Sequence, residues 1–404
     1  MIFVGIDWAE AHHDVCVLDP EGGVLIKGRV PDGVEGVSRL YAMVSEHAQE
    51  PSEVVVGIEI DRGLLVSALV GAGYHVYAVN PFAVSRYRDR HASSRAKSDP
   101  GDAKVLADLV RTDRRNHREV SADTDLAEAI KILARTHQSL VWSRQRQLNQ
   151  LRSTLREFYP GALQAFGRDL ASPEACTILA IASTPERGRR LTPAQISRSL
   201  RVSGRKRRLK ERATEIRDAL RVSQLELPSV LAEAYGEAVR SLVALIDGLR
   251  QQIDRLEQEL AARFEGHPDA EILRSLPGLG LILGARVLAE FGDDPTRYAD
   301  ARARRCYAGS APITRASGTR RVVLARVARN RRLADACYLW AFSALSVSPG
   351  ARAYYDARRA RGATHHQALR ALANRLVGVL HGCLKNSQLY GEDVAWPTAL
   401  EAVA

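Results

Sequence analysis

The chain has 404 residues, and its hydrophobic content of 46% supplies apolar material for two or three folded domains, which excludes a disordered protein. Its formal net charge of +11 at pH 7 indicates a polyanionic partner, either nucleic acid or an anionic membrane surface. The membrane alternative is weak, because the sequence has neither the pattern of a signal peptide nor the ~20 uncharged apolar residues that a spanning helix needs.

Nearly all of the basic residues are arginines, which suit bidentate phosphate contacts but are also frequent in proteins from GC-rich genomes. The 5 cysteines are far apart in the sequence and form no C-x-x-C pair. Neither a zinc site nor a disulfide framework is therefore predicted, and we expect a protein of the reducing cytoplasm.

Residues 1–122 alternate between β-rich and helical segments. The expected elements are strands at 2–7, 13–19 and 23–30, a helix at 33–48, a strand at 54–60, a helix at 62–72, a strand at 75–79 and a helix from about residue 99. The order β-β-β-α-β-α-β-α is that of the ribonuclease H-like α/β fold, a mixed sheet with helices on its faces. We expect this fold for the first domain.

Residues 123–268 have the three- and four-residue periodicity of helices. The most regular apolar stripe alternates steps of three and four, as in a coiled coil, and consists of Val239, Leu242, Ile246, Leu249, Ile253, Leu256 and Leu260. Self-association through this stripe would give a homo-oligomer, either a dimer or a tetramer. Packing of the helix inside its own domain explains the stripe equally well, so both alternatives stay open.

Two arginine-rich runs interrupt the helical region, at 187–190 and at 205–210. Runs of like charge often form solvated faces, but a run this dense in a basic protein is also suited to phosphate contacts. We favour nucleic acid, and the residues assigned to this contact are Arg205, Lys206, Arg207, Arg208 and Lys210.

Residues 269–390 form a third, mostly helical segment, and 391–404 are expected to be a tail. The run Leu276-Pro277-Gly278-Leu279-Gly280 precedes an apolar helix, as in helix-hairpin-helix modules, and its backbone amides could hold a phosphate. We therefore assign Gly278 and Gly280 to nucleic-acid contact. Between residues 297 and 332 arginines are frequent, and Asp300 is the only acidic residue.

Four carboxylates are candidates for an acidic catalytic centre. Asp7 ends the first strand, and Glu59 lies in an apolar strand that the expected topology places beside it, where a buried carboxylate needs a partner or a metal. Asp99 and Asp102 open a helix and can point the same way. Such an oxygen-rich set suits Mg²⁺ or Mn²⁺, and two such ions would assist displacement at a phosphodiester.

Structural roles could also explain two of these residues. Asp99 before Pro100 has the pattern of a helix N-cap followed by proline at the first helical position, and Asp102 favours the helix dipole. His12 and His13 lie close to Asp7 in sequence, but no spaced histidine partner accompanies them. We therefore do not assign either histidine to the metal.

Ser317 precedes a glycine within an arginine-rich stretch and is flanked by Arg315, Arg320 and Arg321. A serine in this setting could attack a phosphodiester with help from the positive charge, and the three arginines would contact nucleic acid. The simpler interpretation is a turn, because serine followed by glycine is typical of turns.

Together these motifs resemble the DEDD transposases, the insertion-sequence family that includes the Piv-type DNA invertases. The matching elements stand in the family's order, and they are Gly5-Ile6-Asp7-Trp8-Ala9, His13-Asp14-Val15, Gly57-Ile58-Glu59, Asn80-Pro81, Lys97-Ser98-Asp99-Pro100-Gly101-Asp102-Ala103, Leu276-Pro277-Gly278-Leu279-Gly280 and Ala316-Ser317-Gly318. The resemblance covers nearly the whole chain.

The resemblance implies a RuvC-like domain in which Asp7, Glu59, Asp99 and Asp102 bind Mg²⁺. It also implies a coiled-coil region and a transposase domain whose Ser317 forms a covalent phosphoserine link to DNA. The two halves of the active site would come from different subunits. The implied partners are DNA, both element ends and target, and a structured non-coding guide RNA, in the bacterial cytoplasm and associated with the nucleoid.

Alternatives remain on each of these points. The residues before Ser317 are less rich in serine than in relatives, so Ser310 is an alternative nucleophile. A Piv-like invertase would act without RNA. A RuvC-like junction nuclease would use a metal-activated water, with Ser317 only a turn residue. A nucleic-acid-binding protein with a decayed acidic site would have no activity.

Overall fold

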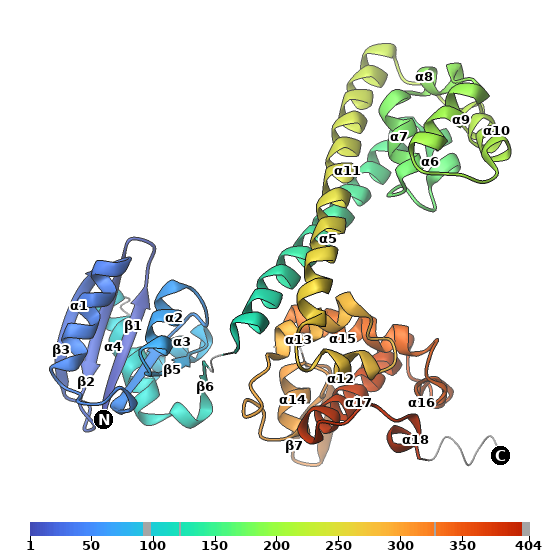
Figure 1. The fold of residues 1–404 in the computed structure, drawn as a ribbon. Helices are drawn as coiled ribbons and strands as arrows, with labels where there is room; N and C mark the ends of the chain where they lie inside the picture. Colours follow the sequence, from blue (N-terminus) through green and yellow to red (C-terminus); the bar gives the residue numbers. More distant parts are fainter. Residues whose placement is uncertain (92–97, 121–122, 327–328, 398–404) are drawn as a thin grey trace. The chain divides into compact units, whose positions relative to one another are not determined.

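The computed structural model describes residues 1–91, 98–120, 123–326 and 329–397. The chain divides into two compact units, Met1–Asp123 and Thr124–Ala404, here called unit 1 and unit 2 (Figure 1). The first boundary expected from the sequence lies one residue earlier. The second expected boundary, after residue 268, falls within unit 2 and stays a prediction.

Unit 1 contains a mixed sheet with the strand order β3-β2-β1-β4-β5-β6. Its strands are β1 (Ile2–Trp8), β2 (His12–Leu18), β3 (Val24–Pro31), β4 (Val54–Ile58), β5 (His75–Ala78) and β6 (Arg118–Glu119). Strands β1, β4 and β5 are parallel to one another, whereas β2, β3 and β6 run antiparallel to their neighbours. The α/β architecture expected from the sequence is confirmed, and the order of β1 to β5 agrees with a ribonuclease H-like topology.

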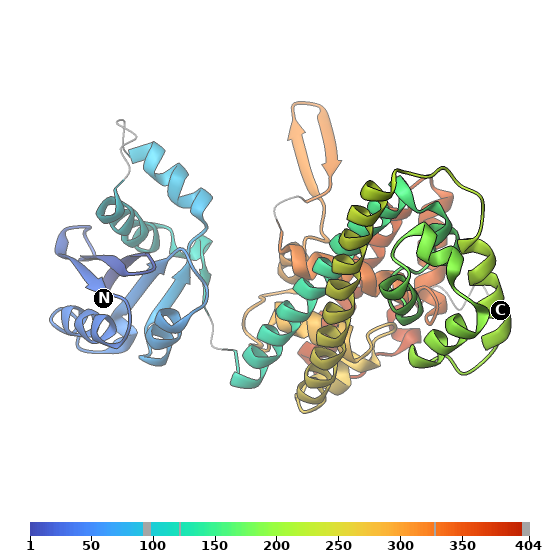
Figure 2. The same cartoon turned by 90° about the horizontal axis from the view of Figure 1, so that it is seen from above.

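Helices cover both faces of this sheet (Figure 2). These helices are α1 (Val34–Ser45), α2 (Leu64–Gly71), α3 (Pro81–His91) and α4 (Asp99–Thr112), and short 3₁₀ turns occur at Pro51–Glu53 and Arg114–Asn116. Strand residues with side chains on one face pack with α1 and α2, and those on the other face pack with α3 and α4. The alternation of the strand residues thus builds two small cores. Helix α3 was not expected from the sequence.

Two glycines allow α4 to lie directly on the backbone of the sheet. A Cβ atom on Gly5 of β1 would lie 1.8 Å from the carbonyl oxygen of Ala103 and 2.4 Å from the amide nitrogen of Ala107. A Cβ atom on Gly57 of β4 would lie 2.6 Å from the carbonyl oxygen of Leu106. Real Cβ atoms do not approach so closely, so any other residue would push α4 away from both strands.

Unit 2 is built around two long helices that lie side by side, α5 (Asp125–Phe158) and α11 (Ser229–Glu265). The start of α5 and the end of α11 share one hydrophobic core, and the end of α5 and the start of α11 share another. The two helices are therefore antiparallel. Side-chain oxygens cap several helices, as Thr124 does for α5 by accepting from the amide of Ala127.

The apolar stripe of α11 packs inside unit 2. Val239, Ile246, Ile253 and Leu260 are at most 2% exposed, whereas the alternate leucines of the stripe are only half-buried. Packing inside the domain therefore accounts for one half of the stripe. Self-association through its other half stays a prediction.

A helical lobe, which comprises residues 159–228, connects the end of α5 to the start of α11. Its helices are α6 (Pro160–Phe166), α7 (Pro173–Ile181), α8 (Pro185–Arg190), α9 (Pro193–Val202) and α10 (Leu209–Leu220). Each begins with proline in its first turn except α10, in agreement with the preference of proline for helix starts. Their apolar faces form one core with the adjoining ends of α5 and α11.

The rest of unit 2 is mostly helical, as expected, but it also contains a β-hairpin. The helices are α12 (Ala270–Ser275), α13 (Leu281–Phe291), α14 (Ala301–Tyr307), α15 (Arg331–Ala344), α16 (Pro349–Ala360), α17 (His365–Asn386) and α18 (Glu392–Ala395), and the hairpin consists of β7 (Ile313–Ser317) and β8 (Arg320–Leu324). The sequence suggested only a turn here, because the apolar residues of this segment do not alternate regularly with polar ones. Part of the expected tail is also packed, since α18 lies within it and Trp396 is 5% exposed; residues 398–404 lie outside the described residues.

Within the described ranges, no helix combines the length and the apolar character that crossing a membrane requires.

Replacement of Gly5 by alanine is expected to detach α4 from the sheet and to destabilise unit 1 by about 3 kcal/mol or more, because backbone atoms of α4 cannot yield to the new methyl group. Hydrogen-exchange mass spectrometry of peptides from β1 and β4 in the full chain measures the effect. Gly71→Ala is the matched control, since a Cβ atom there meets no atom within 4 Å. Equal exchange in the two variants would contradict the close packing.

Candidate active site

Three elements bring the predicted carboxylates to one edge of the sheet in unit 1. Asp7 lies near the end of β1, and the parallel register of Ile6 with Ile58 puts Glu59, just after β4, beside it. Asp99 and Asp102 lie in the first turn of α4, which packs on the same face. The close approach of α4 thus sets its carboxylates over the ends of both strands.

The electrostatics of Asp7 show that these groups lie within reach of one another. The pKa of Asp7 is raised to about 6, first by burial and then by the negative charges of Asp102, Asp99, Glu59 and Asp14. Like charges disfavour the ionised form, and a cation placed among them would relieve the repulsion. Among the described residues, however, Asp99 alone of the four predicted carboxylates belongs to a group whose ligand atoms lie within 4.8 Å of one another, together with His12 and Asp14.

Two structural readings of the sequence were wrong. Strand β4 ends at Ile58, so Glu59 is exposed and its carboxylate needs no buried partner. Asp99 is not the N-cap of α4 but its first residue, because the carbonyl of Ser98 accepts the first helical hydrogen bond, from Asp102, at 2.9 Å. Capping therefore does not explain why an aspartate stands at position 99.

Asp102 is the most buried of the four predicted carboxylates, at 6% exposure. Arg88 of α3 forms an ion pair with it at 2.5 Å. This contact fixes one carboxylate oxygen of Asp102. Lys97, which belongs to the same sequence motif, lies outside the described residues. Asp102 is thus positioned by a helix that the sequence analysis missed.

A fifth carboxylate, Asp14, was not assigned from the sequence. It lies directly opposite Asp7 in the antiparallel β1–β2 pair, is 5% exposed, and accepts hydrogen bonds from Arg29 at 2.8 and 3.2 Å. Its signal in the sequence was the alternation of β2, which puts His12, Asp14 and Cys16 on one face. The pairing that brings it to Asp7 is a tertiary contact and could not be read from one segment.

The two adjacent histidines have different surroundings. A ligand atom of His12 lies with those of Asp14 and Asp99, all within 4.8 Å of one another, so His12 is a candidate metal ligand that we had set aside. His13 is 2% exposed and lies 3.1 Å from Asp32, on the opposite face of β2.

The donors at this edge fit a hard divalent cation. Carboxylate oxygens predominate, and Mg²⁺ and Mn²⁺ prefer such ligands, with an imidazole more acceptable to Mn²⁺. Asp14 and Asp102 are each held by an arginine, which keeps their oxygens oriented. The residues present therefore fit a Mg²⁺ or Mn²⁺ site.

Ser317, the predicted nucleophile, is exposed and ends β7 in unit 2. It pairs with Arg320 across a two-residue connection whose first residue, Gly318, has φ of 55°. A positive φ there suits glycine and the tight turns of two-residue hairpins. Among the described residues, the Ser317 side chain has no hydrogen-bond partner, so any group that activates it must come from elsewhere.

The alternative nucleophile, Ser310, is buried at 7% exposure. Its hydroxyl lies 3.2 Å from the carbonyl oxygen of Arg305 and 3.3 Å from Oδ1 of Asn374. These contacts are those of a structural side chain, and burial hinders attack on a large substrate. Of the two candidates, Ser317 is the accessible one, and its role as a nucleophile stays a prediction.

Arg315, Arg320 and Arg321 are exposed on the same hairpin as Ser317. In the part of the chain that the structure describes, no carboxylate forms an ion pair with any of them. They are thus free to contact an anion beside the serine.

The two glycines before α13 serve different purposes. Gly278 has φ of 81°, and a Cβ atom there would lie 2.7 Å from the amide nitrogen of Ala344, so packing alone requires glycine. A Cβ atom on Gly280, by contrast, would meet no atom within 4 Å. Gly280 is the N-cap of α13, a position that favours glycine. Because the space beside it is open, a ligand could also approach the backbone there.

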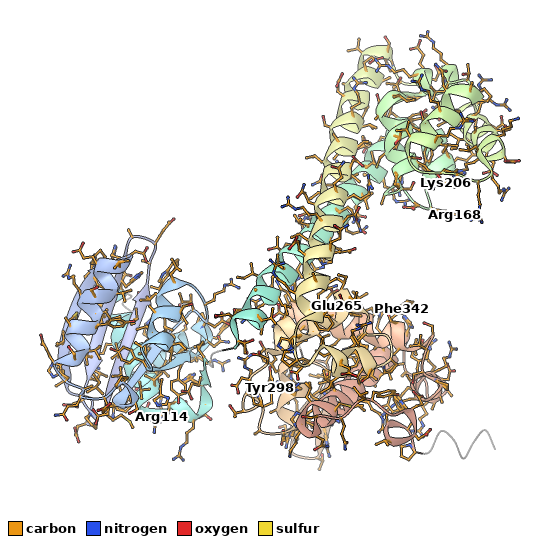
Figure 3. All side chains as sticks on the ribbon, in the orientation of Figure 1. Arg114, Arg168, Lys206, Glu265, Tyr298 and Phe342 are labelled. Carbon is orange, nitrogen blue, oxygen red and sulfur yellow. The ribbon has the colours of Figure 1, made fainter. Side chains whose placement is uncertain are left out.

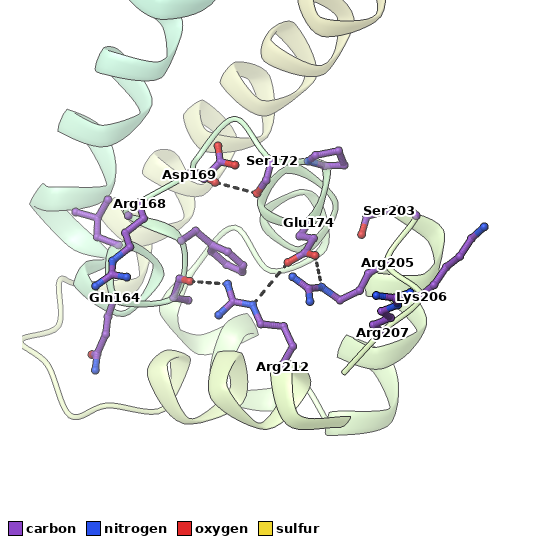
Figure 4. Close-up of a pocket in the computed structure, with 16 residues that line it drawn as sticks. Gln164, Arg168, Asp169, Ser172, Glu174, Ser203, Arg205, Lys206, Arg207 and Arg212 are labelled. Atoms are coloured by element: carbon purple, nitrogen blue, oxygen red, sulfur yellow. Dashed lines mark hydrogen bonds and ion pairs between the residues drawn. The ribbon is translucent and has the colours of Figure 1, made fainter. Parts of the chain in front are cut away.

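The predicted basic run borders a cavity of about 1060 Å³ in the helical lobe (Figure 4). Glu174 lies at its centre and pairs with Arg205 and, at 3.6 Å, with Arg212, which also pairs with Glu215. Lys206 and Arg207 are exposed at the rim. Figure 3 shows Lys206 on the same lobe as Arg168, another residue that lines the cavity.

The remaining residues of the run are also on the surface. Arg208 precedes α10 and lies 4.0 Å from Glu215, and Lys210 is exposed on the first turn of α10. Nucleic-acid contact by the whole run stays a prediction. Arg205 is the least available residue of the run for such a contact, because Glu174 already binds it.

Two families of known proteins match parts of the chain. Residues 4–160 match the IS110 DEDD transposase family, and residues 270–356 match the transposase family named IS116/IS110/IS902. The chain is 46% identical to the mini-circle protein of IS117 from Streptomyces coelicolor, over 100% of this chain and 98% of the relative.

Other relatives are more distant but also match along their whole length. The chain is 30% identical to an uncharacterized protein of insertion element IS116 from Streptomyces clavuligerus, over 96% of both chains. It is 28% identical to an uncharacterized protein of insertion element IS110 from Streptomyces coelicolor, over 100% of this chain and 98% of the relative.

The raised pKa of Asp7 predicts a defined pH dependence of stability in metal-free protein. Because the pKa is higher in the folded than in the unfolded chain, stability falls as pH rises from about 4 to about 6 and then stays constant. Asp7→Asn removes this penalty, so the variant should be more stable at pH 8 by on the order of 2 kcal/mol, with no difference below about pH 4.

A urea titration in EDTA, with hydrogen exchange of β1 peptides as the readout, tests this expectation. Equal stability of both proteins at pH 8 would mean that the carboxylates do not repel one another in the folded chain.

Proposed function

Because this chain belongs to the IS116/IS110/IS902 family of transposases, which cleave and rejoin DNA, we propose that it excises and inserts an insertion sequence through a covalent serine–DNA intermediate. The acidic centre of unit 1, in a RuvC-like domain, and Ser317 of unit 2 are the two halves of the proposed active site. The observation that carries the proposal is the convergence of four carboxylates, those of Asp14, Glu59, Asp99 and Asp102, on Asp7.

In the proposed reaction, the hydroxyl oxygen of Ser317 forms a bond to the phosphorus of a DNA phosphodiester while the bond from phosphorus to one sugar oxygen breaks. The serine loses its proton and the released sugar hydroxyl gains one. Since a phosphodiester is exchanged for a phosphodiester, attack by another sugar hydroxyl reverses the step and rejoins the DNA. Arg315, Arg320 and Arg321 stabilise the negative charge beside the serine.

Asp7, Glu59, Asp99 and Asp102 would hold the cation, with Asp14 and His12 as further donors. A bound Mg²⁺ supplies Lewis-acid stabilisation to the oxygens of the phosphate under attack. The protein contributes orientation, since Arg88 fixes Asp102.

We further propose that the two halves of one site come from different subunits of a homo-oligomer. The half-buried leucines of α11, on the antiparallel α5–α11 pair, are suited to a coiled-coil contact between copies. In this arrangement the long helices would hold together the two subunits that form one active site.

A structured non-coding RNA is proposed to guide the choice of DNA. The exposed Lys206 and Arg207 beside the cavity of the helical lobe are suited to a phosphate backbone. A Piv-like invertase would use the same chemistry without RNA, and a junction nuclease would replace the serine by a water molecule.

Substitution of the two candidate serines separates these mechanisms. Ser317→Ala is expected to abolish the covalent protein–DNA adduct, with a loss of strand cleavage of about 10³-fold or more, and to leave DNA binding unchanged. Ser310→Ala is the matched control and should retain the adduct. Adducts are measured by denaturing electrophoresis with end-labelled DNA that carries the element ends. An adduct that persists in Ser317→Ala and is lost in Ser310→Ala would reverse the assignment, and cleavage without any adduct would favour the nuclease.

Protein expressed with the DNA that flanks its gene is expected to co-purify with one discrete transcript from beside the gene. The double variant Lys206→Gln/Arg207→Gln should retain several-fold less of it, because two phosphate contacts are lost. Sequencing of the bound RNA at moderate salt measures both outcomes. Heterogeneous RNA that is removed by higher salt would favour an invertase without a guide.

A further inference from the structure

Beneath the hairpin that carries Ser317, unit 2 contains a cavity of about 940 Å³, within the size range of ligand sites. Its walls come from α5, α15 and α17 and from the residues on either side of the hairpin, and five arginines line it: Arg146, Arg326, Arg329, Arg331 and Arg370. We propose that this arginine cavity, as we call it, binds the backbone of an unpaired DNA strand next to the phosphate that Ser317 attacks. The inference rests on the proposed function for the identity of that strand.

The charge of the cavity is unbalanced. Asp335 is the only carboxylate among the lining residues, and it is already bound by Arg286 at 2.6 Å and by Gln138 at 2.9 Å. Across the described parts of the chain, no carboxylate lies within 4.0 Å of any of the five arginines. Five like charges around one space repel one another, and an anionic ligand would relieve that repulsion.

Other arginines of unit 2 have carboxylate partners. Glu174 pairs with both Arg205 and Arg212 in the helical lobe, and Glu290 forms an ion pair with Arg135 at 2.8 Å. The five arginines of the arginine cavity have no such partner among the described residues, so they can bind an anion from outside the protein. Guanidinium groups bind phosphate oxygens in pairs, so a phosphodiester backbone is the ligand that fits.

Aromatic rings stand among these arginines. Trp142, Tyr338 and His366 line the same space, and the phenol of Tyr338 lies 2.9 Å from Nδ1 of His366. Rings that alternate with cations are typical of sites for single-stranded nucleic acid, because an unpaired base can stack on a ring. A base inside a duplex is already stacked, so this feature favours an unpaired strand.

The side chain of Arg329 packs directly against the backbone of Gly309 in the wall of the cavity. Gly309 has φ of 69°, and a Cβ atom there would lie 2.4 Å from Cδ of Arg329. Only glycine allows the stem of Arg329 to occupy that place. Ser310, next to it, is fixed by its contact with Asn374. Ser310 therefore has a structural role in the wall of the cavity.

The hairpin links the cavity to the proposed nucleophile. Ile313 pairs with Leu324 at its base, and Ser317 pairs with Arg320 at its tip. Four residues of extended strand span ~13 Å, a distance that a few nucleotides of one DNA strand can cover. A strand that occupies the cavity would therefore lie close in sequence to the phosphate that Ser317 attacks.

The double variant Arg146→Gln/Arg370→Gln tests the proposal in the full-length protein. These residues lie on α5 and α17, so the change leaves the hairpin itself intact. Formation of the Ser317 adduct is measured against the concentration of DNA that carries the element ends. We expect the half-saturating DNA concentration to rise by about 10-fold or more, with the rate at saturation within about 2-fold of wild type. Arg361→Gln, which removes one exposed charge outside the cavity, should change neither value.

Binding to a fluorescent 20-nucleotide single strand supplies a readout that does not need the reaction. In the double variant, the slope of log affinity against log salt should decrease in magnitude by about 1 to 2. The reason is that binding releases fewer counterions when two phosphate contacts are lost. The same change should be smaller for the matching duplex.

The outcomes are distinguishable. An unchanged half-saturating concentration and an unchanged salt slope in the double variant overturn the proposal, even when the Ser317 adduct forms normally. Absence of the adduct in wild type removes the proposed function, and the salt slope then decides alone whether the cavity binds a strand. Loss of co-purifying RNA with unchanged DNA affinity would identify RNA as the ligand and contradict the proposal.

Discussion

The acidic centre depends on one packing constraint, the direct contact of helix α4 with the backbone of strands β1 and β4. Gly5 and Gly57 make this contact possible, since any side chain at either position would collide with backbone atoms of α4. Because the helix lies so close, its first turn brings Asp99 and Asp102 to the strand ends where Asp7 lies. Burial and, after it, repulsion among the carboxylates raise the pKa of Asp7. A cation bound there would relieve the repulsion between the carboxylates, and this relief would favour its binding.

Much of unit 1 could be predicted from the sequence, because its strands are strongly apolar or alternate cleanly. The five longer strands, their order and four candidate acids all followed from periodicity and turn residues. Asp14 could not, because its position opposite Asp7 depends on pairing between strands. Helix α3 lacks an apolar stripe, and the hairpin that contains Ser317 is mostly exposed and basic, so neither left a clear pattern. Sequence reasoning also overestimated the burial of Glu59, because β4 ends at Ile58, just before this residue.

The arginines of unit 2 differ in their partners. In the helical lobe, Glu174 pairs with Arg205 and Arg212. Around Ser317 and beneath its hairpin, the arginines have no carboxylate partner among the described residues. Ser310 is buried in the wall of the arginine cavity, whereas Ser317, the proposed nucleophile, is exposed at the end of β7. The charge that remains unpaired thus surrounds the place where a phosphodiester is proposed to react.

Metal binding by unit 1 tests the central claim most directly, because it does not require DNA, RNA or a second subunit. Electron paramagnetic resonance of Mn²⁺ added to the full-length protein measures free and bound ion, with Asp7→Asn and Glu46→Gln as the variants to compare. Glu46 is exposed at the end of α1, which packs on the opposite face of the sheet. The account predicts that wild type and Glu46→Gln bind Mn²⁺ alike and that Asp7→Asn binds it about 10-fold or more weakly. Equal binding by all three proteins would contradict a metal site at the end of β1.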